Sequence, residues 1–144
     1  MDQTPQPNVT QTVPMFAVAD MAASVRFYVD GLSFEITSRW EPDGTLQWCR
    51  LDRGGGALML QQFPTEGHNA FVPEGKVGEG VSINFQCEDA LAIYHEAVAN
   101  GLDVKTPFVG NAMWVTGFTD PDGYRLFFES DTDVPEETVY SPSS

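Results

Sequence analysis

The stretch that decides the fold is AVADMAASVRFYVDGLSFE, residues 17–35. Its centre predicts a helix, because the carboxylate of Asp20 can accept hydrogen bonds from the free N–H groups of a first helical turn. Apolar residues then recur at helical spacing until Gly31 weakens the end of the helix. These apolar residues are Met21, Val25, Tyr28 and Leu32. Residues 13–19 before the helix and 33–40 after it are typical of strands.

The same order occurs a second time along the chain. Asp89 can cap a second helix 69 residues after Asp20, with Leu91, Tyr94, Val98 and Leu102 on one predicted face. The further strand candidates are residues 45–51 and 57–63 in the first half, and 80–88, 102–109, 112–119 and 124–130 in the second. A repeat this long indicates two half-domains rather than a short solenoid unit. We therefore predict an α+β fold, in which two βαβββ modules form curled half-sheets around a pocket.

The length of 144 residues fits one domain with a sizeable core. We place its first module at residues 13–63, a linker at 64–79 and the second module at 80–130. A flexible arm is expected at residues 1–12. The acidic tail, residues 131–144, is expected to be mobile, or else to wrap a partner subunit through Val134, Val139 and Tyr140.

Composition narrows the class of function. The net charge of −14 would repel nucleic acid and anionic lipid, so neither is an expected partner. The same charge would attract a cationic ligand, or it serves solubility alone. The sequence has no apolar run of transmembrane length and no signal-like start, so cytoplasm is the expected location. Cys49 and Cys87 lie in strand-like segments and are expected to be buried thiols.

Alternation along the strands predicts which side chains face the pocket. In residues 81–87 an apolar set suits packing under the helix, whereas Ser82, Asn84 and Gln86 form the opposite, polar set. That polar set must face solvent or a polar cavity, and we favour the cavity. The equivalent faces of other strands hold Val13, Met15 and Ala17, then Ala57, Met59 and Gln61, and finally Arg125, Phe127 and Glu129. Such a lining suits a neutral or cationic organic molecule better than a metal ion.

Three tryptophans lie near strand ends: Trp40, Trp48 and Trp114. Core or hairpin packing is the commoner role of any one tryptophan. Together they also suit a site that stacks a planar ligand or holds a cation over an indole face.

Residues 17–35 and FTDPDGYRLFF, residues 118–128, resemble the vicinal-oxygen-chelate superfamily over about residues 13–130. That superfamily contains glyoxalase I, extradiol dioxygenases and resistance proteins for fosfomycin and bleomycin. The resemblance implies the fold above and places the family's metal ligands at Val13, Gln61, Ser82 and Phe127. Of these only Gln61 could coordinate a metal, and weakly, so we expect neither a metal site nor a cofactor. His68 and His95 are expected to be solvated surface residues.

Residues 13–35 and LQWCRLDRGGGALMLQQF, residues 46–63, are similar to the bleomycin-resistance branch. That branch consists of small, acidic, catalytically inert dimers. The resemblance implies a metal-independent, non-enzymatic homodimer that sequesters a cationic, aromatic molecule such as bleomycin. It assigns Trp48 a ligand contact by match, and Phe34 and Trp114 only by general location. The full predicted site comprises Phe34, Trp40, Trp48, Met59, Gln61, Ser82, Asn84, Trp114, Phe127 and Glu129.

Two other classes of function stay open at this point. One is a metal-dependent lyase, isomerase or dioxygenase, in which a bound ion polarises a substrate oxygen. The other is a metal-free enzyme or biosynthetic chaperone on the same fold, with Glu129 or His95 in an acid–base role.

Overall fold

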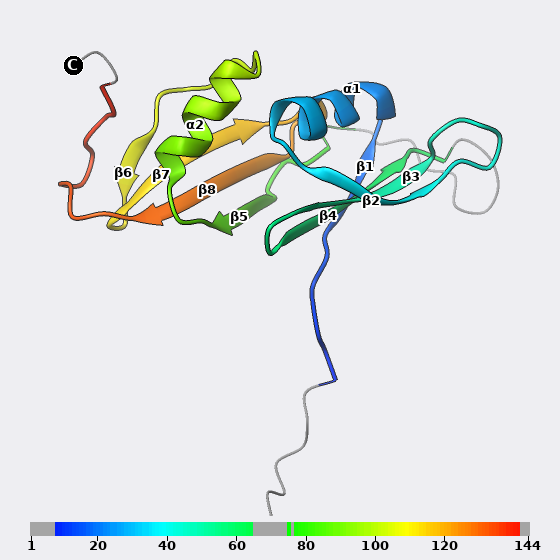
Figure 1. The fold of residues 1–144 in the computed structure, drawn as a ribbon, viewed down its shortest axis with the longest axis horizontal. Helices are drawn as coiled ribbons and strands as arrows, with labels where there is room; N and C mark the ends of the chain where they lie inside the picture. The colour runs from blue at the N-terminus through cyan, green and yellow to red at the C-terminus, as the bar shows by residue number, and fades with distance from the viewer. Residues whose placement is uncertain (1–7, 65–74, 76, 142–144) are drawn as a thin grey trace, which may run out of the picture.

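The computed structural model describes residues 8–64, 75 and 77–141. The first module contains β1 (Met15–Val18), α1 (Met21–Val25) with a continuing π-helical segment η1 (Arg26–Gly31), β2 (Glu35–Trp40), β3 (Trp48–Arg53) and β4 (Gly56–Gln62). The second contains β5 (Ser82–Gln86), α2 (Ala90–Ala99), β6 (Phe108–Gly110), β7 (Met113–Thr119) and β8 (Arg125–Asp131). The predicted α+β fold of two βαβββ modules is confirmed (Figure 1).

Each module forms its own four-stranded sheet, in the order β1-β4-β3-β2 or β5-β8-β7-β6. In both sheets the first strand pairs in parallel with the last, and the other pairs are antiparallel. The sheets lie side by side with both helices above them (Figure 1). We call the side of each sheet away from the helices its open face. The two open faces point in the same general direction rather than toward each other.

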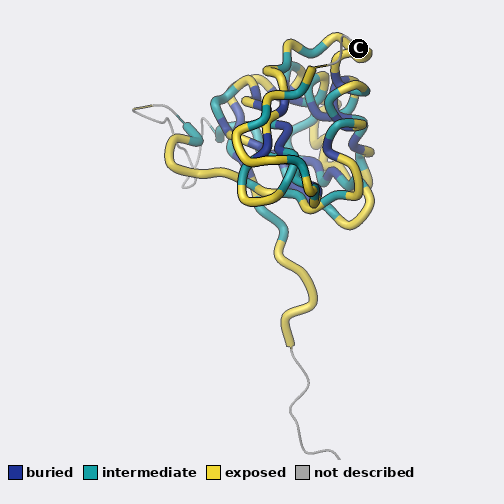
Figure 2. The backbone as a smooth tube through the Cα atoms, turned by 90° about the vertical axis from the view of Figure 1, so that its left-hand side faces the viewer, coloured by how far each residue is buried: buried dark blue, intermediate teal, exposed yellow. Residues whose placement is uncertain are grey.

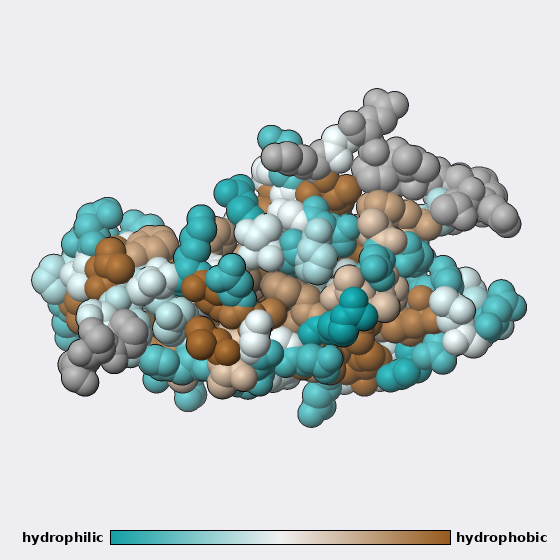
Figure 3. Space-filling view, turned by 90° about the horizontal axis from the view of Figure 1, so that it is seen from above, coloured by the Kyte–Doolittle hydropathy of each residue, from teal (hydrophilic) through white to brown (hydrophobic). Residues whose placement is uncertain are grey.

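Burial along the strands agrees with the predicted alternation. On β4, Leu58 and Leu60 are fully buried under the helix, whereas Met59 and Gln61 are half-buried on the open face. On β8 the buried set is Leu126, Phe128 and Ser130. Seen from the helix side, hydrophobic and hydrophilic patches alternate over the surface (Figure 3). Three of the large hydrophobic side chains that are most exposed lie instead on the open faces: Met15, Trp40 and Phe108.

Both predicted helix caps are present, but the buried face of α2 was predicted wrongly. Asp20 accepts a hydrogen bond from the backbone N–H of Ala23, and Asp89 accepts from those of Leu91 and Ala92. The residues of α2 that are buried are Ala90, Ile93 and Ala97, whereas Tyr94 is half-buried and Val98 is 47% exposed. Small alanines let the helix approach β7 closely, where Thr116 Oγ1 donates to the carbonyl of Ala90 at 2.8 Å.

The acidic tail was expected to be mobile or to wrap a partner subunit, but its residues 136–140 are docked along β6 of the same chain. The N–H of Val109 donates to the carbonyl of Thr138 and the N–H of Tyr140 to that of Pro107, both at 2.9 Å. The carboxylate of Glu136 accepts from the backbone N–H groups of Asn111 and Ala112 at 2.7 and 2.8 Å. The tail thus lies along the outer edge of β6. This strand is shorter than predicted, because residues 102–107 are not part of it.

The two modules share one hydrophobic core. Phe16 of β1 stacks on Tyr124 beside β8 with ring centroids 4.0 Å apart. Across the same junction the hydroxyl of Tyr28 donates to Asp120 Oδ2 at 2.7 Å. Burial raises the pKa of Asp120, and the hydrogen bonds that its carboxylate accepts oppose this shift. Cys49, fully buried, and Cys87, half-buried, are both free thiols, close to the prediction of two buried thiols.

An extended N-terminal arm leaves the body of the protein below the sheets (Figures 1 and 2). Its residues 8–12 are exposed along their whole length. Among the residues with described coordinates, no helix has the length and apolar character needed to cross a membrane.

Candidate functional site

The open face of the first sheet collects four of the predicted site residues. Trp40 and Trp48 are directly opposite each other on β2 and β3, and Trp48 is opposite Gln61 on β4. Met59 lies on the same face of β4, two residues before Gln61. Trp40 is 55% exposed, so an indole surface is available to a ligand. We call these four residues, Trp40, Trp48, Met59 and Gln61, the tryptophan face.

An ion pair and one further carboxylate lie beside the tryptophan face. Arg50 contacts Asp52 on the open face at 3.0 Å. The hydrogen bonds from Arg50 and then Thr37 lower the pKa of Asp52. Arg50 also donates to Gln11 Oε1, which fixes the base of the arm at 3.0 Å. Glu35, opposite Asp52, adds a further negative charge, so this region of the open face is acidic.

The open face of the second sheet holds four more of the predicted residues. Asn84 is opposite Phe127, and Gln86 is opposite Glu129, while Ser82 lies at the start of the same strand. The amide of Gln86 donates to Glu129 Oε2 at 3.0 Å and orients that carboxylate. The face therefore presents an aromatic ring, a free amide and a fixed carboxylate.

Phe34 and Trp114 do not join either open face. Phe34 is 2% exposed in the core, where its ring lies 6.0 Å from Tyr28 and 5.9 Å from Phe85. Trp114 shares the helix-facing side of β7 with Thr116, and its ring lies 5.8 Å from Tyr140 of the tail. Their general position near strand ends did not determine the side of the sheet on which they lie.

A cleft of about 890 Å³ lies between the modules, bounded by the β3–β4 turn, β5 and the start of α2. It reaches only Phe34 and Asn84 of the predicted site. Its other lining residues were not predicted, although the glycine run 54–56 marks the turn that forms one wall. The cleft depends on how the two modules pack against each other, which local sequence patterns do not specify.

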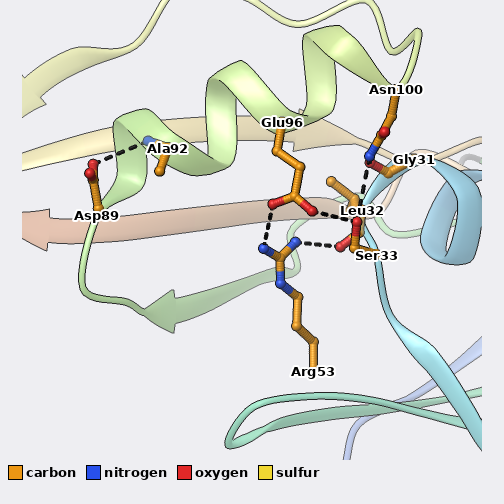
Figure 4. A network of polar contacts seen from close by, with 8 residues as sticks. All are labelled: Gly31, Leu32, Ser33, Arg53, Asp89, Ala92, Glu96 and Asn100. Carbon is orange, nitrogen blue, oxygen red and sulfur yellow. Dashed lines mark hydrogen bonds and ion pairs between the residues drawn. The ribbon is translucent and has the colours of Figure 1, made fainter.

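A polar network joins the modules at the rim of this cleft (Figure 4). Arg53, the last residue of β3, reaches Glu96 of α2 at 2.8 Å and also donates to the carbonyl of Leu32. Ser33, with a positive φ of 61°, donates to the other oxygen of Glu96 at 2.6 Å. Asn100 completes the network by donating to the carbonyl of Gly31 at 3.0 Å.

The Glu96 carboxylate should give the junction a measurable pH dependence. The hydrogen bond from Ser33, and after it the contact with Arg53, lowers the pKa of Glu96. The ionised carboxylate therefore stabilises the folded protein fully at pH values above the unfolded pKa of about 4.3. This stabilisation is lost as the pH falls through the lower pKa of the folded state. Glu96→Gln should cost up to about 1 kcal/mol at pH 7, because the pair is partly exposed. Urea unfolding at pH 7 and again near pH 3 measures the difference. Glu88→Gln, an equal charge change on the cleft rim, is the control, and an equal loss in both variants at pH 7 would contradict the assignment.

The donor set at the family's metal-ligand positions does not fit a metal ion. Val13 and Phe127 offer no ligand atom, and Ser82 offers only a neutral hydroxyl. Gln61 is held by hydrogen bonds from its amide nitrogen to the carbonyls of Gln47 and Gln62. Within residues 8–64, 75 and 77–141, three or more His, Cys, Asp or Glu side chains do not gather as a metal-binding group.

The family model described as "Glyoxalase/Bleomycin resistance protein/Dioxygenase superfamily" matches residues 10–128. The chain belongs to this superfamily. Its members include both enzymes and binding proteins, so membership leaves the presence of catalysis open. No curated protein matches the sequence.

Several solved structures share the fold of this chain at low sequence identity. TioX from Micromonospora sp. ML1 is 19% identical, with a TM-score of 0.67 over 85% of this chain and 99% of that one. TnmS3, an antibiotic binding protein from Streptomyces sp. CB03234, is 16% identical, with a TM-score of 0.65 over 88% and 100%. A bleomycin-binding protein complexed with bleomycin is 20% identical, with a TM-score of 0.62 over 85% and 99%.

Proposed function

We propose that this protein is a metal-independent binding protein that sequesters a cationic, aromatic small molecule, with bleomycin as the leading candidate. The observation that carries the proposal is the tryptophan face, where two tryptophans at paired strand positions and a thioether share one accessible surface on a chain of net charge −14. Indole faces attract planar rings and cations, and the overall field raises the local concentration of a cation. No chemical step is part of this function.

The complete site is formed by a homodimer. Each open face carries only part of the predicted residues, and within one chain the two faces lie side by side. A second copy that places its second sheet opposite the tryptophan face brings Asn84, Phe127 and Glu129 to the other side of the ligand. The carboxylate of Glu129, oriented by Gln86, would then meet the positive charge of the ligand. Burial of Met15, Trp40 and Phe108 in this contact favours the dimer.

Tryptophan fluorescence during titration tests the proposal. Metal-free and copper-loaded bleomycin should each give saturable quenching at submicromolar concentration, and added salt should weaken it because the negative field is screened. An anionic aromatic dye is the control and should not saturate in the same range. No fluorescence change with either form of bleomycin at any concentration would refute bleomycin as the ligand.

A further inference from the structure

The cleft between the modules leaves apolar side chains uncovered on the helix-facing side of the second sheet. Phe85 stacks on buried Phe128 with ring centroids 4.7 Å apart and touches Phe34 edge-on, yet it is itself only half-buried. Ile83, two residues earlier on β5, is also half-buried. The floor of the cleft is therefore an accessible, mainly aromatic surface that suits an apolar body.

Two charged groups at the cleft already have partners within the protein. Arg53 is paired with Glu96 and also donates to a backbone carbonyl. The carboxylate of Asp89 accepts hydrogen bonds from the first turn of α2. An anionic ligand would thus lose hydration without gaining a free counter-charge from Arg53, and the net charge of −14 additionally repels an anion. These conditions disfavour an anionic occupant.

One polar group at the cleft remains available for recognition. Glu88 lines the cleft and is exposed, and its carboxylate makes no hydrogen bond or ion pair with any residue that the structure describes. A carboxylate accepts hydrogen bonds, so it can bind an N–H or O–H group of a ligand. Asn84 and Gln86 also lie along the cleft, but strand alternation turns their side chains to the open face.

We propose that this cleft is a second small-molecule site, separate from the tryptophan face, for a molecule with an aromatic body and an N–H or O–H group that donates to Glu88. The cleft volume of about 890 Å³ lies within the range of ~300–1,000 Å³ typical of ligand pockets. All its walls come from a single chain, so the site does not require the dimer.

Binding of N-phenyl-1-naphthylamine, an uncharged aromatic fluorophore with an N–H group, tests this inference. The wild-type protein should give a saturable rise in probe fluorescence. Ala92 is exposed on α2 and lines the cleft, so Ala92→Phe should place a ring in the cleft and weaken probe binding at least tenfold. Ala99→Phe makes the same change seven residues further along the helix, outside the cleft, and should leave affinity unchanged. Circular dichroism checks that both variants are folded.

One further variant and one further measurement distinguish the cleft from the tryptophan face and from a subunit contact. Trp48→Ala should retain probe binding, because Trp48 does not line the cleft. Unchanged probe affinity in Ala92→Phe, or no saturable binding by the wild type, would overturn the inference. Light scattering measures the oligomeric state of the wild type and of Ala92→Phe. If the variant loses the probe only because a dimer dissociates, the cleft is a subunit contact and the inference is equally wrong.

Discussion

Trp48→Ala should weaken bleomycin binding about tenfold, which corresponds to ~1.4 kcal/mol, and leave the fold intact. One aromatic or cation–π contact contributes ~0.5–2 kcal/mol beyond simple area burial. Trp48 occupies the centre of the tryptophan face, opposite both Trp40 and Gln61. It is only half-buried, so its loss opens no large core cavity. Isothermal titration calorimetry measures the affinity, and thermal unfolding by circular dichroism measures stability.

Trp114→Ala is the matched control, because it makes the same substitution on the opposite side of a sheet. Its ring packs on Tyr140 of the docked tail, 5.8 Å away. We therefore expect Trp114→Ala to lower thermal stability and to leave bleomycin affinity unchanged. Equal affinity in Trp48→Ala and wild type would remove Trp48 from the site. Equal losses of affinity in both variants would show a general effect of destabilisation instead.

The module order was predictable because its signals are local. Asp20 and Asp89 cap helices through hydrogen bonds within three residues, and strand alternation sorts side chains between two faces. The docked tail was not predictable in this way. It is held by backbone hydrogen bonds from Val109 and Tyr140, and backbone groups are the same in every sequence. The Glu136 carboxylate contacts two N–H groups that are available only because of the local turn geometry.

For the candidate site, the sequence could predict only which face of a strand each side chain occupies, because side-chain direction alternates along a strand. Counting along the strands placed Met59, Gln61, Ser82 and Asn84 on the side opposite to the more deeply buried side chains, as the burial pattern has them, while their role as ligand contacts stays a prediction. Trp114 was assigned by proximity to a strand end, although the same counting places it with Thr116 on the helix side. The cleft was missed because it arises where the β3–β4 turn of one module meets β5 and α2 of the other. Its one local signal is the glycine run 54–56.

Asp120→Ala should have the largest effect on stability of any substitution discussed above, a loss of at least about 3 kcal/mol. Asp120 is 4% exposed. It accepts hydrogen bonds from the Tyr28 hydroxyl at 2.7 Å and from the backbone N–H groups of Asp122 and Tyr124, both at 2.9 Å. Truncation leaves these donors without an acceptor, and each buried, unsatisfied donor costs ~1–3 kcal/mol. Because Tyr28 belongs to the first module and Asp120 to the second, the loss falls on the junction between them.

Urea unfolding of matched variants separates this network from the turn that contains it. Asp122→Ala removes a carboxylate two residues away, which accepts an exposed hydrogen bond from the backbone N–H of Ala19 at 3.0 Å and a long one from the Ser24 hydroxyl at 3.5 Å. We expect a loss of no more than about 1 kcal/mol. Tyr28→Phe should cost an intermediate amount, and combining it with Asp120→Ala should cost less than the sum of the two, because both remove the same hydrogen bond. Equal losses in Asp120→Ala and Asp122→Ala would show that the buried network contributes no more than an exposed turn contact. A fully additive double variant would mean that Tyr28 and Asp120 stabilise the protein independently, and that their hydrogen bond does not couple the modules.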